Sequence, residues 1–506
     1  MTHADLYLLQ GTAALALTTE ALGKLAPSVA EQAEAAAFTC LDLFDQSLRR
    51  SNRMLLDIGT SLALIQPDGR VITQTLHGTP RFTPDLADGP VKRALSDLSP
   101  LRSLLPLGTG KATAFTLAFV DEDQKTHCRA ALYSLTGAEG QTLLLVRPQG
   151  LRGYDKALTD LRQHLDASGE AFDMATLYAL LVPAAPVPDP KTKSALAPGQ
   201  TAFTAATAII ARQIPVAQRA EPGIIADHDT EFLHDYRVAL RRIRSVLSLF
   251  RDVYQPAQTT ALKARFATLM AQTGPLRDLD VLLLGKQDYY DLLPPSLHPG
   301  LDTMFALRKA ERTRAHARLS RQLRSKAHAQ AMTDLAGLFS SPHTLLPGPA
   351  ADRAAQDFAS SLIWKRFRKI RQIAASIGPD TGDLAVHALR IHCKKLRYLM
   401  EFFAGLFPGP AVKSVLTPLK RVQDHLGLVN DLSVQETHLQ TFLQGLDGLA
   451  DGPKLQVAQT VGALTTVLHR RKLEERQKTI ATLSGFLSPE VQKTFRDLFH
   501  ARKPKP

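Results

Sequence analysis

The feature that most constrains the fold of this chain is a pattern of basic residues that occurs twice. His234 opens the segment HDYRVALRRIRSVLSLF, and His387 opens HALRIHCKKLRYLMEFF 153 residues later. Both segments place arginine three residues after the histidine, basic residues at plus seven and plus eight, and arginine at plus ten. The same offset relates Phe250 to Phe403, Gly274 to Gly427, and Asp278 to Asp431. We infer an internal repeat of about 150 residues, with a four-helix bundle in each copy.

The sequence that surrounds these segments predicts an all-α domain over residues 201–500. Apolar residues recur there at three- and four-residue spacing, and charged residues fill the remaining positions. A Pro- and Gly-rich break, SPHTLLPGPAAD (341–352), divides the region into two pieces of comparable size. We therefore place copy 1 at about 201–340 and copy 2 at about 353–500.

The N-terminal region has a different texture. Residues 182–200 contain five prolines and no apolar periodicity, which predicts a semi-extended linker after a first domain at 1–181. Short apolar runs bounded by Gly, Pro and Asp predict strands at 61–65, 71–76, 114–120 and 142–146, and helical patterns occur near 91–98 and 155–165. These patterns indicate an α+β fold with an antiparallel sheet.

The charge of the chain is concentrated in the helical region. Residues 1–200 hold 18 Lys and Arg against 21 Asp and Glu, whereas residues 201–506 hold 43 against 27, from totals of 61 and 48. Such asymmetry points to a polyanionic or membrane partner, although a basic surface can also simply face water. The apolar stretches are too short for a membrane span, and we expect no signal peptide. The three cysteines are scattered, which favours a reducing cytoplasm over a disulfide framework or a cysteine-based zinc site.

Helical geometry aligns the basic residues of each duplicated segment. At about 100° per residue, positions plus three, seven and ten fall near 300°, 340° and 280° relative to the histidine at zero, so they form one stripe. Apolar positions at plus six, nine and thirteen fall near 240°, 180° and 220° and form the adjoining core face. These apolar residues are Leu240, Ile243 and Leu247 in copy 1, and Cys393, Leu396 and Met400 in copy 2. Arg242 and Lys395, at plus eight, lie farther round and are weaker candidates.

A basic stripe is often a solvated helix face with acidic neighbours, but here those neighbours are missing. Asp235 is the only acidic residue between His234 and Arg244, and none lies between His387 and Arg397. We therefore expect an anion between these groups, with the two histidines donating to phosphate oxygens. No spacing typical of a metal site accompanies either histidine, and we interpret His392 as a packed or solvent-facing residue. The expected binding residues on these helices are His234, Arg237, Arg241, Arg242, Arg244, His387, Arg390, Lys394, Lys395 and Arg397.

Further basic residues could widen the binding surface. The segment WKRFRKIR (364–371) opens copy 2, and another basic series follows Arg308 in copy 1. Asp278 and Asp431 are expected to cap or orient the arginines. The additional binding candidates are Arg308, Arg312, Lys365, Arg368, Lys369 and Lys420.

At these residues the sequence resembles the CHAD family, the conserved-histidine α-helical domain, over about residues 200–500. The paired histidine–arginine helices and the downstream segments RDLD (277–280) and NDL (430–432) carry the resemblance. The resemblance implies two pseudo-symmetric four-helix bundles around a basic central cavity and binding of inorganic polyphosphate. It also implies that the protein could associate with polyphosphate granules.

CHAD domains often follow a CYTH domain, a triphosphate-binding barrel or tunnel fold, and residues 40–78 are similar to part of one. Asp42, Asp45, Arg49 and Arg50 carry that likeness. A working CYTH triphosphatase opens with Glu-x-Glu-x-Lys, whose carboxylates hold the metal, yet the opening strand here reads ADLYLLQG (4–11). The resemblance therefore implies a degenerate, inactive CYTH-like barrel.

We accordingly predict a cytoplasmic protein, which could be targeted to polyphosphate granules, that binds inorganic polyphosphate without catalytic residues, metal or cofactor and without a membrane. Two alternatives remain open. Residual triphosphatase activity would need acidic metal ligands in the N-terminal domain, and nucleic-acid binding would be compatible with the pI near 9.6. The basic helices carry few aromatic residues for base stacking, which disfavours nucleic acid.

Overall fold

The computed structural model describes residues 6–168, 170–182, 196–197, 199–378, 381–446 and 448–500. The chain divides into two compact units, Met1–Lys191 and Thr192–Pro506. Residues 183–195 and 198, which make up most of the expected linker, lie outside the described residues. We describe each unit by itself.

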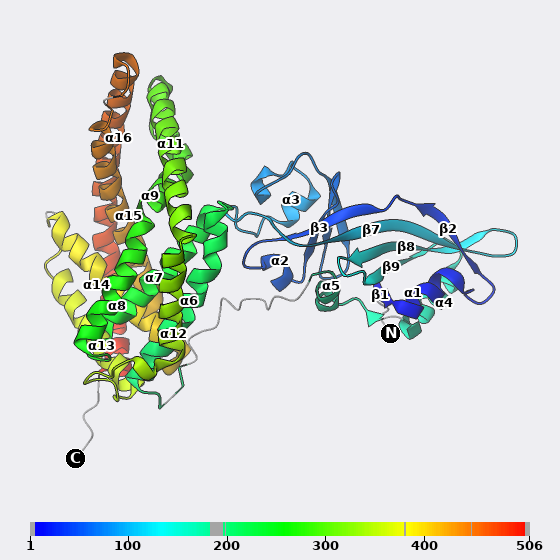
Figure 1. The fold of residues 1–506 in the computed structure, drawn as a ribbon, viewed down its shortest axis with the longest axis horizontal. Helices are drawn as coiled ribbons and strands as arrows, with labels where there is room; N and C mark the ends of the chain where they lie inside the picture. The colour runs from blue at the N-terminus through cyan, green and yellow to red at the C-terminus, as the bar shows by residue number, and fades with distance from the viewer. Residues whose placement is uncertain are drawn as a thin grey trace. The chain divides into compact units, whose positions relative to one another are not determined.

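The first unit is built on one antiparallel sheet, as the sequence predicts (Figure 1). Its strand order is β10-β1-β9-β8-β7-β3-β4-β5-β6, and β2 pairs with β7 beside this path. The strands are β1 (Tyr7–Gln10), β2 (Ala26–Gln32), β3 (Ala36–Asp42), β4 (Met54–Asp57), β5 (Ser61–Ile65), β6 (Val71–Thr75), β7 (Leu105–Val120), β8 (Thr126–Gly137), β9 (Thr142–Gly150) and β10 (Glu170–Ala171). The helices are α1 (Gly11–Thr19), α2 (Ser47–Arg50), α3 (Pro90–Ala94), α4 (Asp155–Ser168) and α5 (Met174–Leu181).

Apolar residues cover both faces of the sheet, because successive side chains of a strand point to opposite sides. Leu6 and Leu8 belong to a buried cluster that includes Leu177 of α5. Tyr7 belongs to a second cluster, which includes Leu161 of α4. The opening strand therefore contributes core residues at the positions where a CYTH triphosphatase carries its charged motif.

The sheet does not close into the barrel that the CYTH resemblance implies. In the described residues the strand path ends at β10 on one side and at β6 on the other. The face that carries Leu6 and Leu8 is packed instead by α5, through Leu177, Tyr178 and Leu181. Antiparallel pairing is consistent with a CYTH-like domain, but side chains of α5 fill the space against this face.

The aspartates and arginines of the CYTH likeness build a tight turn. The Asp42 carboxylate is fully buried and accepts backbone N–H bonds of 2.7–2.9 Å from Leu43, Leu48 and Arg49. Asp45 forms an ion pair of 2.6 Å with Arg50. These contacts satisfy the first amides of α2, so they have a structural role.

The second unit is helical, and its helices repeat at the spacing found in the sequence. Four helices of copy 1 begin 153 residues before their counterparts in copy 2, which confirms the duplication. The pairs are α6 (Ala202–Ile225) with α13 (Ala355–Ala374), α7 (Thr230–Leu249) with α14 (Asp383–Phe403), α8 (Pro256–Gln272) with α15 (Gly409–Leu443), and α11 (His298–Leu323) with α16 (Asp451–Phe486). Copy 1 also contains α9 (Gly274–Leu284), α10 (Lys286–Leu292) and α12 (Lys326–Ser340), and copy 2 ends with α17 (Pro489–Phe499).

The copies are related by a pseudo-two-fold axis, since equivalent residues meet one another. The rings of Phe250 and Phe403, which are equivalent, stack with centroids 4.8 Å apart and planes 11° apart. The Ala202 amide donates to the Arg353 carbonyl at 2.8 Å, and the equivalent Ala355 amide donates to the Gln200 carbonyl at 2.8 Å. This exchange of identical bonds is the signature of an isologous interface.

The copies share a hydrophobic core. Leu301 and Phe305 of α11 are buried in one cluster with Leu432 of α15 and Val461 of α16. In Figure 1, α11 and α16 extend side by side at one end of this unit. Pro275 accounts for a difference between the copies, because proline at the second position of α9 favours a helix start where α15 continues unbroken.

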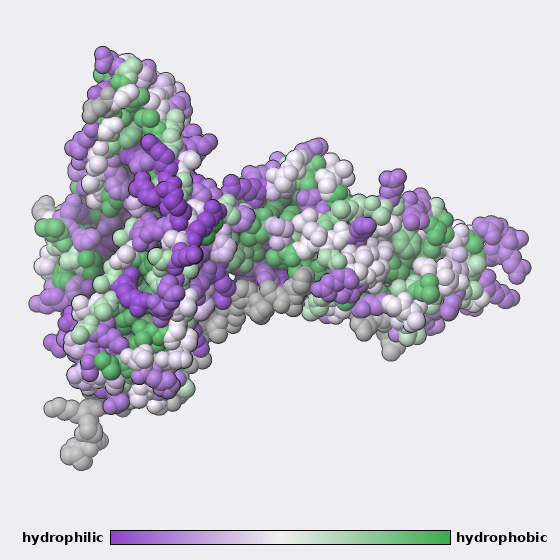
Figure 2. Space-filling model, viewed as in Figure 1, coloured by the Kyte–Doolittle hydropathy of each residue, from purple (hydrophilic) through white to green (hydrophobic). Residues whose placement is uncertain are grey.

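The surface carries a mixture of polar and apolar residues. Figure 2 shows hydrophilic residues gathered over α9 and α11 on the visible face of the helical unit. None of the helices within the described ranges combines the length with the apolar character that a membrane span requires.

Candidate functional site

Helices α7 and α14 hold the two basic stripes. The Asp229 side chain accepts the Glu231 and Phe232 amides at 2.9 and 3.1 Å and so fixes the start of α7. The predicted core positions of both helices are at most 1% exposed, which confirms the orientation expected from the sequence. We define the paired stripes as His234, Arg237, Arg241 and Arg244 in copy 1, with His387, Arg390, Lys394 and Arg397 in copy 2.

The two stripes influence one another electrostatically. Burial, followed by the positive charges of Arg241, Arg390 and Arg397, lowers the pKa of Lys394 to about 8, against the opposing effect of Asp431. Arg241 belongs to copy 1 and Lys394 to copy 2, and α7 packs against α14. The fold therefore brings cations from both copies together.

In copy 1 the stripe residue Arg237 lies close to residues at the junction of α8 and α9. The Arg237 guanidinium donates to the Thr273 hydroxyl at 2.6 Å. Burial lowers the pKa of Arg237, the Asp278 carboxylate raises it, and Arg241 and Arg277 lower it. Asp278 thus offsets part of the charge of Arg237, in line with the orienting role expected for it.

His234 lies in the same positive surroundings. Burial lowers its pKa below 6.5, and the neighbouring Arg277 lowers it further. The imidazole is therefore neutral near neutral pH, and it can still donate one hydrogen bond.

In copy 2 the stripe borders a small pocket between α14 and α15. The pocket has a volume of about 180 Å³, and its lining includes His387, Arg390 and Asn430. His387 Nδ1 lies 3.1 Å from the Asn430 side-chain oxygen, and Arg390 lies 4.0 Å from Asp431. The Nε of Arg390 is buried and has no hydrogen-bond partner within the described part of the chain. A buried donor of this kind favours an acceptor supplied by a ligand.

Arg397 also has a carboxylate neighbour. It lies 3.5 Å from Glu401, one turn farther along α14. Arg244 and Lys420 are exposed, and Arg242 is half-buried.

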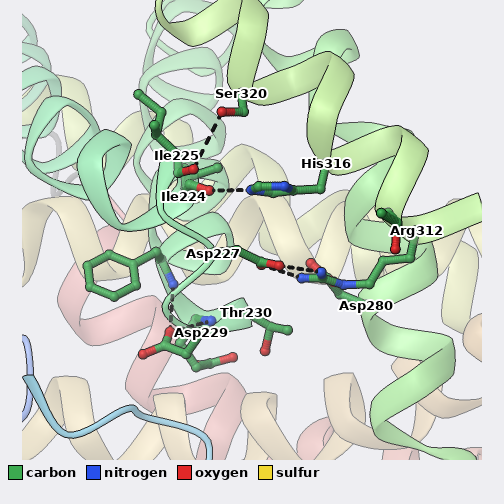
Figure 3. A network of polar contacts seen from close by, with 12 residues as sticks. Ile224, Ile225, Asp227, Asp229, Thr230, Asp280, Arg312, His316 and Ser320 are labelled. Carbon is green, nitrogen blue, oxygen red and sulfur yellow. Dashed lines mark hydrogen bonds and ion pairs between the residues drawn. The ribbon is translucent and has the colours of Figure 1, made fainter. Parts of the chain in front are cut away.

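Two of the expected binding residues are engaged elsewhere, as Figure 3 shows for Arg312. The Arg312 guanidinium makes two bonds of 2.7 Å to Asp227 and one of 2.8 Å to the buried Asp280. Arg308 donates to Glu311 at 2.6 Å and lies over the Phe442 ring, 4.4 Å from its centroid. We leave both arginines out of the proposed binding set, because their charges are already compensated within the fold.

Another group of expected residues lies apart from the paired stripes. Lys365, Arg368 and Lys369 line a different pocket, together with His392, and no residue of the paired stripes contributes to it. Lys395 belongs with this group, since its pKa is lowered by burial and then by Arg366 and Arg251.

Sequence reasoning missed several arginines that lie near the expected binding residues. Arg277 stands beside Asp278 in the quoted segment and acts on both His234 and Arg237, but it lies off the duplicated helix. Its equivalent in copy 2 is Asn430, so the repeat itself gave no sign of a basic residue there. Arg251 and Arg366 have no basic equivalent in the other copy either, because Ala404 and Gln213 occupy those positions.

Comparisons with known proteins bear on the helical unit. The chain is similar to the crystal structure of the CHAD domain from the plant Ricinus communis, with 27% identity, a TM-score of 0.45, and coverage of 55% of this chain and 95% of that one. It is also similar to PptA from Streptomyces chartreusis, with 18% identity, a TM-score of 0.44, and coverage of 57% and 100%. The comparison with curated proteins found no match. Residues 208–440 match the family model described as the CHAD domain, and the helical unit of this chain therefore contains a CHAD domain.

Proposed function

We propose that this CHAD domain binds inorganic polyphosphate through the paired stripes. The observation that carries the proposal is Lys394, whose pKa is lowered by burial and by arginines from both copies. Holding such cations together costs free energy, and an anion that lies between them removes the cost. Guanidinium groups suit this ligand because they form paired hydrogen bonds to phosphate oxygens.

The surroundings of the stripes favour phosphate over nucleic acid. The aromatic residues of these helices, including Tyr236, Phe250, Tyr398 and Phe402, are all buried. Proteins that bind single strands present exposed aromatic side chains on which bases stack. The stripes therefore offer phosphate contacts without a surface for bases.

Binding is the activity proposed, without catalysis. The first unit places Leu6 and Leu8 in a core cluster, where a CYTH triphosphatase would need carboxylates for its metal. Within the described ranges, no group of three or more His, Cys, Asp and Glu side chains is arranged to hold a metal ion. Targeting of the protein to polyphosphate granules would follow from the same binding.

The test is titration of the full chain with fluorescently labelled long-chain polyphosphate. Arg237→Ala combined with Arg390→Ala should weaken binding at least about 100-fold, because each of the two lost charge-assisted bonds contributes about 1.5–3 kcal/mol and about 1.4 kcal/mol is tenfold in affinity. The matched control is Lys413→Ala with Arg470→Ala, which removes the same charge from exposed positions on α15 and α16. Equal effects of the two double variants would refute the proposal, since binding would then depend on net charge alone.

Competition separates polyphosphate from nucleic acid. We expect long-chain polyphosphate to remain bound when duplex or single-stranded nucleic acid is added at equal phosphate concentration. Salt dependence alone cannot make this distinction, because the affinity for either polyanion falls as salt rises. Displacement by nucleic acid would assign the stripes to a different partner.

A further inference from the structure

A second basic pocket lies on another side of α14. It has a volume of about 690 Å³ and is lined from α13 by Lys365, Arg366 and Lys369, from α14 by His392, and by Arg251 after the end of α7. His392 follows Arg390 by two residues, which places it about 200° around the helix from the stripe. This pocket, which we call the α13 pocket, is therefore separate from the paired stripes.

The charge of the α13 pocket is uncompensated. No carboxylate belongs to its lining, and its lysines and arginines form no ion pair within the described ranges. Burial lowers the pKa of Arg366, and the charge of Arg251 lowers it further. The same two arginines act on Lys395. These cations repel one another until an anion enters.

A hydrogen bond from Arg366 fixes the neutral form of His392, which can donate a hydrogen bond among these cations. Arg366 donates to His392 Nδ1 at 2.9 Å, which requires a lone pair on that nitrogen. The imidazole proton must then reside on Nε2. Burial, together with the charges of Arg366, Lys395 and Lys369, lowers the pKa of His392 to about 4, so this arrangement persists at neutral pH.

The duplication shows that the fold does not require these residues. At the equivalent positions of copy 1, Gln213 replaces Arg366, Val216 replaces Lys369 and Ala239 replaces His392. The helices α6 and α13 nevertheless begin at equivalent positions and pack in equivalent ways. Arg366, Lys369 and His392 therefore add a property to copy 2 beyond the packing of its helices, whereas Lys365 has the basic equivalent Arg212 in copy 1.

We propose that the α13 pocket binds a compact triphosphate-type anion, independently of the paired stripes. Its volume is typical of small-molecule sites, which are about 300–1,000 Å³. Cations of α13 and Arg251 converge on one place with the neutral His392 of α14 beside them, which matches clustered phosphates better than an extended chain. Two sources carry this chemistry, namely the end of a polyphosphate chain and a nucleoside triphosphate, whose base could contact Leu249, Leu362 and Leu399.

The test is calorimetric titration of the full chain with tripolyphosphate, and separately with ATP and inorganic phosphate. Arg366→Gln combined with Lys369→Gln should weaken tripolyphosphate binding at least about tenfold and change long-chain polyphosphate affinity by less than about threefold. Arg237→Ala with Arg390→Ala should weaken the binding of long-chain polyphosphate and leave the affinity for tripolyphosphate nearly unchanged. Because Arg366 is half-buried, Lys365→Gln with Lys369→Gln, both at exposed positions, provides a second variant that keeps the buried bond.

Each outcome bears on the pocket separately from the stripes. Binding of tripolyphosphate without ATP supports the pocket and identifies a polyphosphate end as its source, and equal binding of both supports recognition of the triphosphate itself. Unchanged tripolyphosphate affinity in both pocket variants would overturn the inference, as would equal affinity for inorganic phosphate. A stripe variant without effect would refute the proposed function and leave the pocket standing.

Discussion

Raising the pH above 8 should weaken polyphosphate binding through one side chain, Lys394. Its pKa in the free protein is about 8, below the ordinary 10.5. An anion between the stripes favours the charged form and so raises this pKa again. The lysine is protonated with or without ligand below about pH 7, whereas at about pH 9.5 it must take up a proton to bind.

The size of the effect follows from this shift. If binding restored the ordinary pKa completely, affinity would fall about 30-fold between about pH 7 and about pH 9.5. Lys394 is only half-buried, so solvent screening reduces the coupling, and we expect a fall of about tenfold. In the free protein His234 is neutral over this range, because its pKa is lowered by burial and by Arg277.

The assay is fluorescence anisotropy of labelled polyphosphate at constant ionic strength across this pH range. Lys394→Arg is the matched control, since guanidinium keeps its charge and should show a flat profile apart from titration of other groups. Lys394→Gln should bind about tenfold more weakly near pH 7 and show the same flat profile. If the wild type and the Lys394→Arg variant lost affinity in parallel, Lys394 would not be the coupled group.

Three further outcomes are expected. Arg312→Met should lower the free energy of unfolding, measured with urea, by about 3 kcal/mol, because Asp280 would remain buried without its partner. The same variant should keep its polyphosphate affinity, measured by anisotropy, within about twofold of the wild type. A large loss of affinity in the folded variant would restore Arg312 to the binding set. Phe403→Ala should lower the free energy of unfolding by about 3–4 kcal/mol, since it removes one ring of the stack on the pseudo-two-fold axis. Urea unfolding followed by circular dichroism measures this loss, and a loss below about 1 kcal/mol would contradict that role. The full chain incubated with magnesium and tripolyphosphate should release no phosphate above background, and release that depends on the first unit would revive the triphosphatase alternative.

The periodicity of the sequence could predict which residues face the core, because helical geometry fixes directions around a single axis. It could not predict which neighbour a side chain meets. Arg312 looked like one more basic residue of its helix, yet its partners Asp227 and Asp280 come from other elements of copy 1. Lys365 and Lys369 looked like extensions of the stripe, but α13 packs on another side of α14. The neighbours of these side chains depend on how distant segments pack together, which a helical wheel of one segment does not describe.

The sheet of the first unit shows the same limit. Alternating apolar runs predicted its strands at 61–65 and 142–146, where β5 and β9 lie. Closure depends on whether the two end strands pair, which alternation within each strand does not encode. Here the strand path stays open, while α5 covers the face that carries Leu8.

The symmetry of the helical unit also bears on the choice of polyanion. A two-fold axis relates the stripes, so a ligand that spans both presents its two halves to equivalent groups in opposite directions. An inorganic polyphosphate chain reads the same from either end, whereas a nucleic-acid strand has a direction. The pseudo-symmetry of the stripes therefore favours a chain without direction, such as the proposed polyphosphate ligand, over a nucleic-acid strand. The symmetry is broken where Arg277 is equivalent to Asn430 and where Arg366 is equivalent to Gln213. At these positions the two copies would contact a ligand differently.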